Sequence, residues 1–262
     1  PNLSPLDKTK TMNKKLFLGA LTCALLALPL AISSCSQSTP RPKTAEDERN
    51  NKGHETPTSA DITLRSGILK PGVTFSESTT YDDVDWSKST EQKITIKNYT
   101  PGAEGEDTFS VESAGKTPGR VYALEISYKN AAGQPMNDQL ISADQLDRHQ
   151  HFLRQVLQRT DKGYIYVDIN APHLLLYKYA YTDVYHGAKN PVGLKGLIYF
   201  DKPTDSSEAE AQVHIVLQHF YNTKFTDLAG RKVRPYYIPS APQSEPDITL
   251  QVFFRLNEKS NH

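Results

Sequence analysis

Short runs that alternate between apolar and polar residues dominate the chain from Asp61 onwards. A period of two is typical of β-strands that bury one face. The first runs are "DITLR", "VTFSE", "QKITIKN", "DTFSV" and "RVYALEISY". The later runs are "GYIYVDI", "HLLLYKYAYTDVY", "GLKGLIYF", "AQVHIVLQHF" and "DITLQVFFRL". Because turn signals such as Lys70-Pro71-Gly72 separate them and helices do not alternate with them, residues 61–262 are predicted to form one mainly β domain, an antiparallel β-sandwich.

One segment, "SADQLDRHQHFLRQVLQRT", fits a helix as well as a strand. Its apolar residues between Leu146 and Leu157 recur at helical spacing, and Ser142 and Gln145 have the spacing of a capping box. The surrounding strands favour a different division. We expect one short helix from Ser142 that ends near residues 147–149, followed by an extended stretch over residues 150–156.

The N-terminal part has the layout of an export signal. Lys14 and Lys15 precede a short apolar run that ends in "ISSC", residues 32–35. The run is shorter than the roughly 20 residues that a membrane-spanning helix needs. An aliphatic residue, two small residues and a cysteine resemble a bacterial lipobox. We therefore expect residues 12–34 to be a lipoprotein signal peptide, Cys35 to be lipidated and residues 1–11 to be a mis-called start.

Residues 35–60 differ from the domain that follows. Between Ser36 and Ala60 no aliphatic residue is larger than alanine, and proline, serine, threonine and charged residues dominate. Such a composition does not bury enough apolar surface to offset the entropy of ordering the chain. We expect a disordered, flexible tether between the lipidated cysteine and the domain.

Charge and cysteine content exclude several function classes. Of the 30 basic and 30 acidic residues, four basic and one acidic precede Cys35, which leaves 26 against 29 and a net charge of −3. No clustered basic surface for nucleic acid is indicated. Because Cys23 lies in the expected signal peptide, the mature domain has no thiol for a disulfide, a zinc site or catalysis. The motifs G-x-S-x-G and H-E-x-x-H and a P-loop are also absent, so we expect no enzyme.

The stretch "DRHQHF" places His149 and His151 two residues apart, with Gln150 between them. If the backbone is extended, both imidazoles leave the same face, where they could chelate a transition metal or give haem an axial ligand. If it is helical, they point about 200° apart and need distant partners. His219 in "IVLQHF" is such a partner. We take these three histidines as candidate metal ligands, and hydrogen-bonded structural histidines are the alternative.

Three tyrosines in "YKYAYTD", Tyr177, Tyr179 and Tyr181, alternate along one predicted strand. Tyrosines on one face of a sheet could form the wall of a ligand cavity. The pattern fits a half-buried core with hydroxyl groups at its rim at least as well, and both interpretations stay open.

Several motifs follow one another in an order that is similar to that of a known protein group. The stretch "RVYALEISYKNAAGQPMNDQLISADQLDRHQHF" is followed by "YKYAYTD", "NPVGLKGLIYF" and "IVLQHF". This part, residues 120–220, resembles a group of Bacteroidota-type surface lipoproteins. The resemblance implies an outer-membrane location beside a TonB-dependent receptor that takes up iron or another metal. Some members carry extra histidines in the first strand, whereas "LRSGILKPGVTF" has none, which weakens the transfer of a metal site from the group.

Together these features predict an outer-membrane lipoprotein that binds a small ligand for an uptake system. The ligand would be a metal ion or a metal complex such as haem, and the partners would be the membrane and a TonB-dependent receptor. The alternative is a structural or adhesive cell-surface lipoprotein that has no small-molecule ligand. A hydrolase is disfavoured because the sequence shows no pairing of nucleophile and base.

Overall fold

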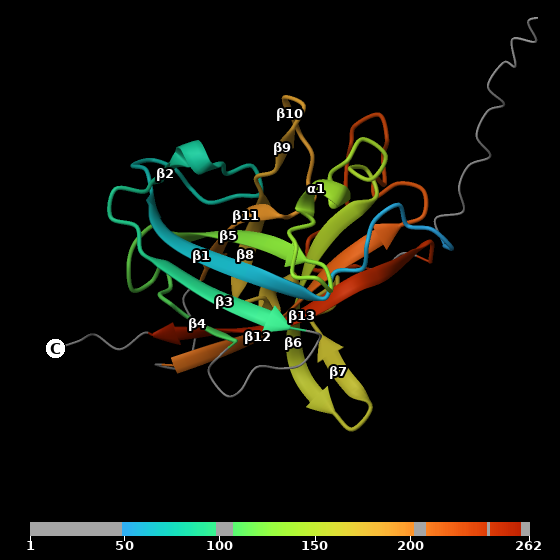
Figure 1. Ribbon diagram of the computed structural model, residues 1–262. Coiled ribbons are helices and arrows are strands. Elements are labelled where there is room, and N and C mark those ends of the chain that lie inside the picture. Colours follow the sequence, from blue (N-terminus) through green and yellow to red (C-terminus); the bar gives the residue numbers. More distant parts are fainter. Residues whose placement is uncertain (1–48, 98–106, 202–207, 240–241, 258–262) are drawn as a thin grey trace, which may run out of the picture. The chain divides into compact units, whose positions relative to one another are not determined.

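The computed structural model describes residues 49–97, 107–201, 208–239 and 242–257 (Figure 1). The expected upstream residues, signal peptide, lipidated Cys35 and first part of the tether lie outside these residues. Among the described residues, no helix is long and apolar enough to cross a membrane.

The first of two curled sheets is centred on two long antiparallel strands (Figure 1). These are β1 (Ser59–Leu69) and β5 (Arg120–Lys129), which pair along almost their whole length. The sheet continues beyond β5 with β11 (Lys195–Phe200) and β8 (Tyr177–Tyr181). Beyond β1 it continues with β2 (Val84–Asp85) and β3 (Glu91–Lys97).

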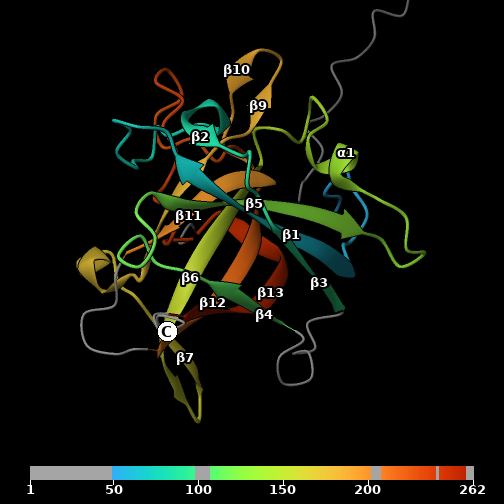
Figure 2. The ribbon, with the colours of Figure 1, turned by 90° about the vertical axis from the view of Figure 1, so that its left-hand side faces the viewer.

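The second sheet crosses beneath the first (Figure 2). Its strands follow the order β4 (Thr108–Val111), β13 (Ser244–Asn257), β12 (Glu208–Phe220), β6 (His149–Thr160) and β7 (Gly163–Tyr166). Only the pairing of β4 with β13 is parallel among these described strands. The remaining elements are short: η1 (Tyr81–Asp83), α1 (Asn137–Leu140), η2 (Pro172–Leu174), β9 (Val184–Tyr185) and β10 (Ala188–Lys189).

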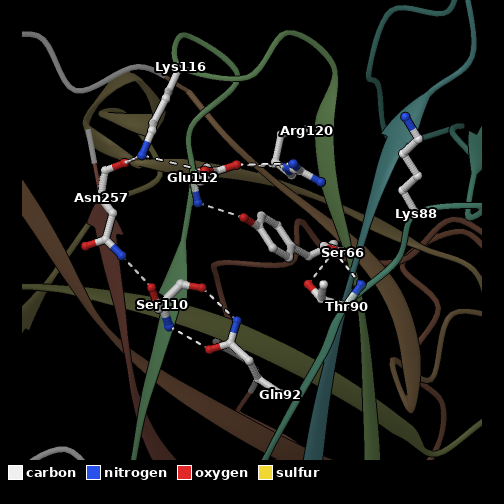
Figure 3. Close-up of a pocket in the computed structure, with 10 residues that line it drawn as sticks. Ser66, Lys88, Thr90, Gln92, Ser110, Glu112, Lys116, Arg120 and Asn257 are labelled. Carbon is white, nitrogen blue, oxygen red and sulfur yellow. Dashed lines mark hydrogen bonds and ion pairs between the residues drawn. The ribbon is translucent and has the colours of Figure 1, made fainter. Parts of the chain in front are cut away.

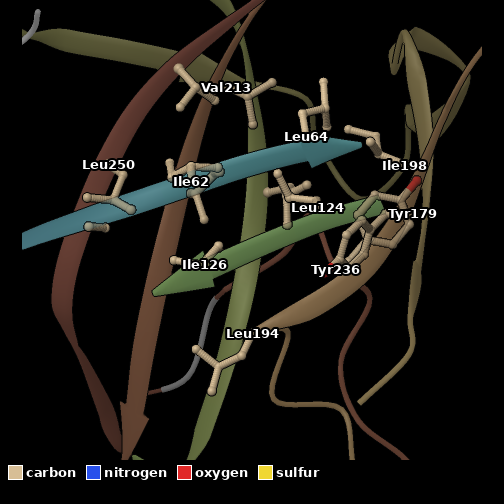
Figure 4. Packing of buried hydrophobic residues seen from close by; sticks show 14 of the residues in the cluster. Ile62, Leu64, Leu124, Ile126, Tyr179, Leu194, Ile198, Val213, Tyr236 and Leu250 are labelled. Atoms are coloured by element: carbon tan, nitrogen blue, oxygen red, sulfur yellow. The ribbon is translucent and has the colours of Figure 1, made fainter. Parts of the chain in front are cut away.

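The core lies between the two sheets, as the alternating pattern predicts. Ile62 and Leu64 of β1 face Val213 of β12 and Leu250 of β13, and each of these side chains is at most 1% exposed (Figure 4). Leu124 of β5 joins the same cluster. The prediction of a mainly β sandwich with one short helix is therefore confirmed.

Two local predictions differ from the structure. The helix lies at Asn137–Leu140, before the expected Ser142, and residues 141–148 form turns in which Ser142 accepts backbone hydrogen bonds from Gln145 and Leu146. The stretch "VTFSE" is a loop rather than a strand, because it follows the Pro71-Gly72 turn and folds back so that Phe75 stacks on Tyr199. The extended conformation expected after the turns is confirmed, since β6 begins at His149.

The folded part begins before the expected boundary at Asp61. Strand β1 starts at Ser59, and the backbone N–H of Thr58 donates to the carbonyl of Lys129 at 2.9 Å. Residues 49–58, which we call the N-terminal arm, lie beside the ends of β12 and β13 (Figure 1).

Candidate metal centre

Three neighbouring strands of the second sheet bring together His149, His219 and Asp247. His149 opens β6, and the strand register pairs it directly with His219 near the end of β12. Asp247 belongs to β13, which pairs with β12. Leu217 of β12 lies opposite Ile248, but the next residue of β12, Gln218, lies opposite Pro246, so the register skips Asp247. Asp247 is thus the extra residue of a β-bulge.

The bulge explains why an aspartate faces the histidines. Ile248 and Leu250 are fully buried in the core. In a regular strand Ile248 and its neighbour Asp247 would point to opposite faces. A bulge changes this alternation locally and re-aims one side chain. The carboxylate of Asp247 is therefore directed towards the same point as the imidazoles of His149 and His219.

The fourth member of the cluster, His54, comes from the N-terminal arm. Its side chain is 1% exposed and lies against the rings of His149 and His219, with ring centroids 4.8 and 5.4 Å away. The arm makes a tight turn before it, where Gly53 has φ +69°. This positive φ favours glycine, and a Cβ atom at Gly53 would also lie 2.5 Å from the side-chain nitrogen of Gln145, which would have to move.

The four donor atoms form a nearly regular tetrahedron. The closest separations are 3.0 Å (His149 Nε2 to His219 Nδ1), 3.1 Å (His54 Nε2 to His149 Nε2) and 3.2 Å (His149 Nε2 to Asp247 Oδ2). The others are 3.3 Å (His54 Nε2 to His219 Nδ1), 3.4 Å (His54 Nε2 to Asp247 Oδ2) and 3.8 Å (His219 Nδ1 to Asp247 Oδ2). Tetrahedral zinc with metal–ligand distances of about 2.0–2.2 Å places its donors about 3.3–3.6 Å apart.

Surrounding groups orient the donors. The Nδ1 atoms of His54 and His149 lie 2.8 and 3.0 Å from the carbonyl oxygens of Glu55 and Gln145. A carbonyl only accepts, so each Nδ1 carries the proton and each Nε2 presents a lone pair to the centre. Lys52 donates to Asp247 Oδ1 at 2.7 Å, while Oδ2 faces the histidines. Such outer contacts are characteristic of metal ligands.

The pKa shifts of three of the four side chains favour the protonation states in which they could bind a metal ion. Burial lowers the pKa of His149, and burial together with the charge of His149 lowers the pKa of His219 to about 3. Burial alone would raise the pKa of Asp247, but hydrogen bonds to His149 and His54 outweigh it and lower that pKa. Burial also tends to lower the pKa of His54, but the hydrogen bond and the negative charge of Asp247 outweigh burial and raise this pKa. Burial thus opposes protonation of His149 and His219, and the hydrogen bonds leave Asp247 a carboxylate, which are the forms that a cation binds.

Of the three histidines proposed from the sequence, the structure brings two together. His151 is fully buried, with Nδ1 2.7 Å from the carbonyl oxygen of Val192 and Nε2 2.8 Å from the hydroxyl of Tyr128. Burial lowers the pKa of His151 to about 4. Both of its ring nitrogens are thus engaged in hydrogen bonds, one to the loop before β11 and one to β5 of the first sheet, and His151 lies outside the cluster.

Sequence reasoning missed His54 and Asp247. His54 is the only histidine of the polar stretch between Ser36 and Ala60, which was the available signal. Asp247 stands at the start of the apolar run "DITLQVFFRL", where an aspartate ordinarily marks a turn.

The three tyrosines proposed as a ligand wall, Tyr177, Tyr179 and Tyr181, belong to the core between the sheets. The hydroxyl of Tyr177 donates to the carbonyl of Leu153 at 2.8 Å, and that of Tyr181 donates to the carbonyl of His151 at 2.5 Å. Tyr179 lies flat against β11, where a Cβ atom on Gly196 would meet its hydroxyl at 2.0 Å. Tyr179 and Tyr181 also border a cavity of about 410 Å³.

A polar cavity of about 510 Å³ lies at the edge of the sandwich, between β3 and β4 (Figure 3). The side chain of Gln92 donates to the carbonyl of Ser110 at 2.7 Å and accepts from its backbone N–H at 2.9 Å. Glu112 forms ion pairs with Arg120 at 3.2 Å and with Lys116 at 3.6 Å. These contacts fasten the edges of the two sheets together at a distance from the histidine cluster.

Comparison of the chain with models of known protein families, with curated proteins and with solved structures yields no match. A function for the chain is therefore inferred from its own residues, of which His54, His149, His219 and Asp247, the His3Asp cluster, have the most specific geometry.

Proposed function

We propose that this protein is a lipid-anchored outer-membrane protein that binds one transition-metal ion, of the zinc class, in the His3Asp cluster. The observation that carries the proposal is the set of six donor separations, which average about 3.3 Å and match the edges of a zinc tetrahedron. Imidazole nitrogens select zinc and its neighbours, whereas calcium and magnesium need more oxygen ligands.

The cluster favours a bare ion over haem. All four ligand side chains are at most 2% exposed, and their donors converge on one point. A haem iron instead takes its axial ligands from opposite sides of a flat ring. Four protein ligands and no open position are typical of an ion that is part of the fold.

The location is supported by the sequence. "ISSC" places a lipidated Cys35 ahead of the domain, and stable anchoring takes more than one acyl chain. Ser36 after the cysteine, rather than aspartate, favours the outer membrane. The closed coordination favours a retained ion and thus a structural surface lipoprotein. Delivery to an uptake system beside a TonB-dependent receptor, as the resemblance implies, would require one ligand to leave first.

Metal analysis of the full chain, purified in detergent without chelator, tests the proposal. We expect one zinc ion per chain, and we expect cobalt(II) in its place to show the strong visible absorption of tetrahedral coordination. His149→Ala and His219→Ala should lose the ion, whereas the exposed His173→Ala and the buried but uninvolved His151→Gln should keep it. If the wild type retains no ion after exposure to zinc, or if all four variants retain it equally, the proposal is wrong.

A further inference from the structure

We infer that the bound ion fastens the N-terminal arm to the second sheet, and that loss of the ion releases the arm while the sandwich stays folded. The inference rests on the proposed metal binding. It concerns what the ion controls: the junction between the β-domain and the chain that leads back to Cys35.

The four ligands differ in what else holds them. His149, His219 and Asp247 belong to β6, β12 and β13, whose backbones are paired with one another over many residues. These three side chains keep their places without an ion. His54 precedes β1 and belongs to no strand. Its position depends on the centre itself and on the neighbouring contacts of the arm.

Those neighbouring contacts are mainly polar. Lys52 pairs with Asp247 and with the partly exposed Glu245, both at 2.7 Å, and the backbone N–H of Glu55 donates to Gln139 at 2.8 Å. Ion pairs that water reaches contribute little to stability. Apart from the side chain of His54 itself, only Pro57 is buried among the arm's described residues, so the hydrophobic effect adds little. A structural zinc site, by contrast, contributes far more binding free energy, which its ligands share.

Without a cation the centre also holds His54 less firmly. The Nε2 atoms of His54 and His149 each present a lone pair, because their Nδ1 protons point to carbonyl groups. They lie 3.1 Å from each other and 3.3 and 3.0 Å from Nδ1 of His219. The lone pairs of His54 and His149 repel each other, and a proton on Nδ1 of His219 bonds to only one of them at a time, whereas an ion at the centre binds all the donors. When it leaves, His54 is the ligand whose backbone is free of strand pairing and therefore the one that moves away.

Release of the arm would change the reach of the domain from its anchor. The arm spans residues 49–58, and an extended chain covers about 3.3–3.6 Å per residue. The metal ion would thereby decide whether up to roughly 35 Å of chain is packed on the domain or added to the tether. On this inference the centre couples metal supply to the position of the domain above the membrane.

Limited proteolysis of the full chain tests the inference at a single bond. Trypsin cleaves after Lys52, whose ammonium group is bound to Asp247 in the docked arm. We expect cleavage between Lys52 and Gly53, measured by mass spectrometry, to be at least about tenfold faster after chelation than in the zinc-loaded protein. The bond between Lys162 and Gly163, in the exposed turn between β6 and β7, is the internal reference and should be cut at the same rate in both states.

Two variants complete the test. His54→Ala should show fast cleavage after Lys52 with and without zinc, whereas Thr56→Ala, an exposed change in the same arm, should behave as the wild type. If zinc binds but leaves the Lys52–Gly53 rate unchanged, the inference is wrong and the proposed function stands. If both bonds accelerate together on chelation, the whole domain opens and the inference is equally wrong. If no zinc binds at all, the proposed function fails first.

Discussion

The histidines of β6 show how hydrogen-bond partners decide the role of a side chain. His149 and His151 are two residues apart, buried and of one type. His149 has one ring nitrogen on a carbonyl and the other facing His54 and His219. His151 has both nitrogens committed, to Val192 and to Tyr128. Only a histidine with an uncommitted lone pair directed at other ligands contributes to a metal centre.

A single side chain, Asp61, also predicts how the stability of the fold depends on pH. Burial tends to raise its pKa, but hydrogen bonds from Lys129, Thr95 and Lys93 outweigh this and lower the pKa to about 2. Because the folded value lies below that of the unfolded chain, about 3.9, the carboxylate stabilises the protein above pH 4 and loses this effect as the pH falls through 2. Urea unfolding should therefore show that Asp61→Asn is less stable than the wild type at pH 6. The difference in free energy of unfolding between the two proteins should disappear near pH 2. The control Asp82→Asn, an exposed change, should unfold with the same free energy as the wild type. If Asp61→Asn is still less stable than the wild type by the same amount at pH 2, the stabilising role of the Asp61 carboxylate is wrong.

At the scale of elements, the start of β6 is held by a buried lysine. Lys224 is fully buried, and its ammonium group donates to the carbonyls of Leu146 and His149 at 2.9 and 3.1 Å and to the side chain of Asn190. Burial lowers the pKa of Lys224 to about 7. These bonds fix the turns before β6 and thus the position from which His149 reaches the centre.

Replacement of this lysine should affect both the fold and the metal centre. Lys224→Met keeps a similar apolar stem but leaves three buried acceptors without a donor, so we expect unfolding to become easier by about 2–4 kcal/mol. Zinc affinity should fall about 10- to 100-fold, since an outer contact of a ligand is lost. Chemical denaturation and competition with a zinc indicator measure the two effects. Lys162→Met, on an exposed turn, is the control; wild-type zinc affinity in Lys224→Met would show that Lys224 does not position His149.

For the whole molecule, the proposed anchor sets the context of the metal centre. Two cysteines precede the domain, and only Cys35 follows the "ISS" of the lipobox. We expect the wild type to stay with membranes through a salt wash and Cys35→Ala to become soluble. Cys23→Ala, inside the expected signal peptide, should stay with the membranes. Fractionation followed by immunoblotting measures this, and Cys35→Ala that pellets as the wild type does would refute the lipobox assignment.

Local pattern was enough to predict the class of fold. Alternation along a strand is a property of neighbouring residues, so the buried faces of β1, β5, β12 and β13 can be inferred without knowing which strands pair. The same reasoning predicted the extended backbone from Gln150 and named two members of the cluster, His149 and His219, as candidate ligands. The same reasoning predicted the helix too far along the chain, because the apolar residues of the turns at 141–148 have the spacing of a helix.

The metal centre itself was decided by tertiary structure. His54 and His149 are 95 residues apart in the chain, and His149 and His219 are 70 apart. Which strands become neighbours depends on how the two sheets bury their faces together, and no local period records it. The aim of Asp247 depends on a bulge that exists only because β12 and β13 are paired out of step at one residue. Residue types determined by themselves that candidate metal ligands were present; the pairing of strands and the docking of the arm decided which four of them meet.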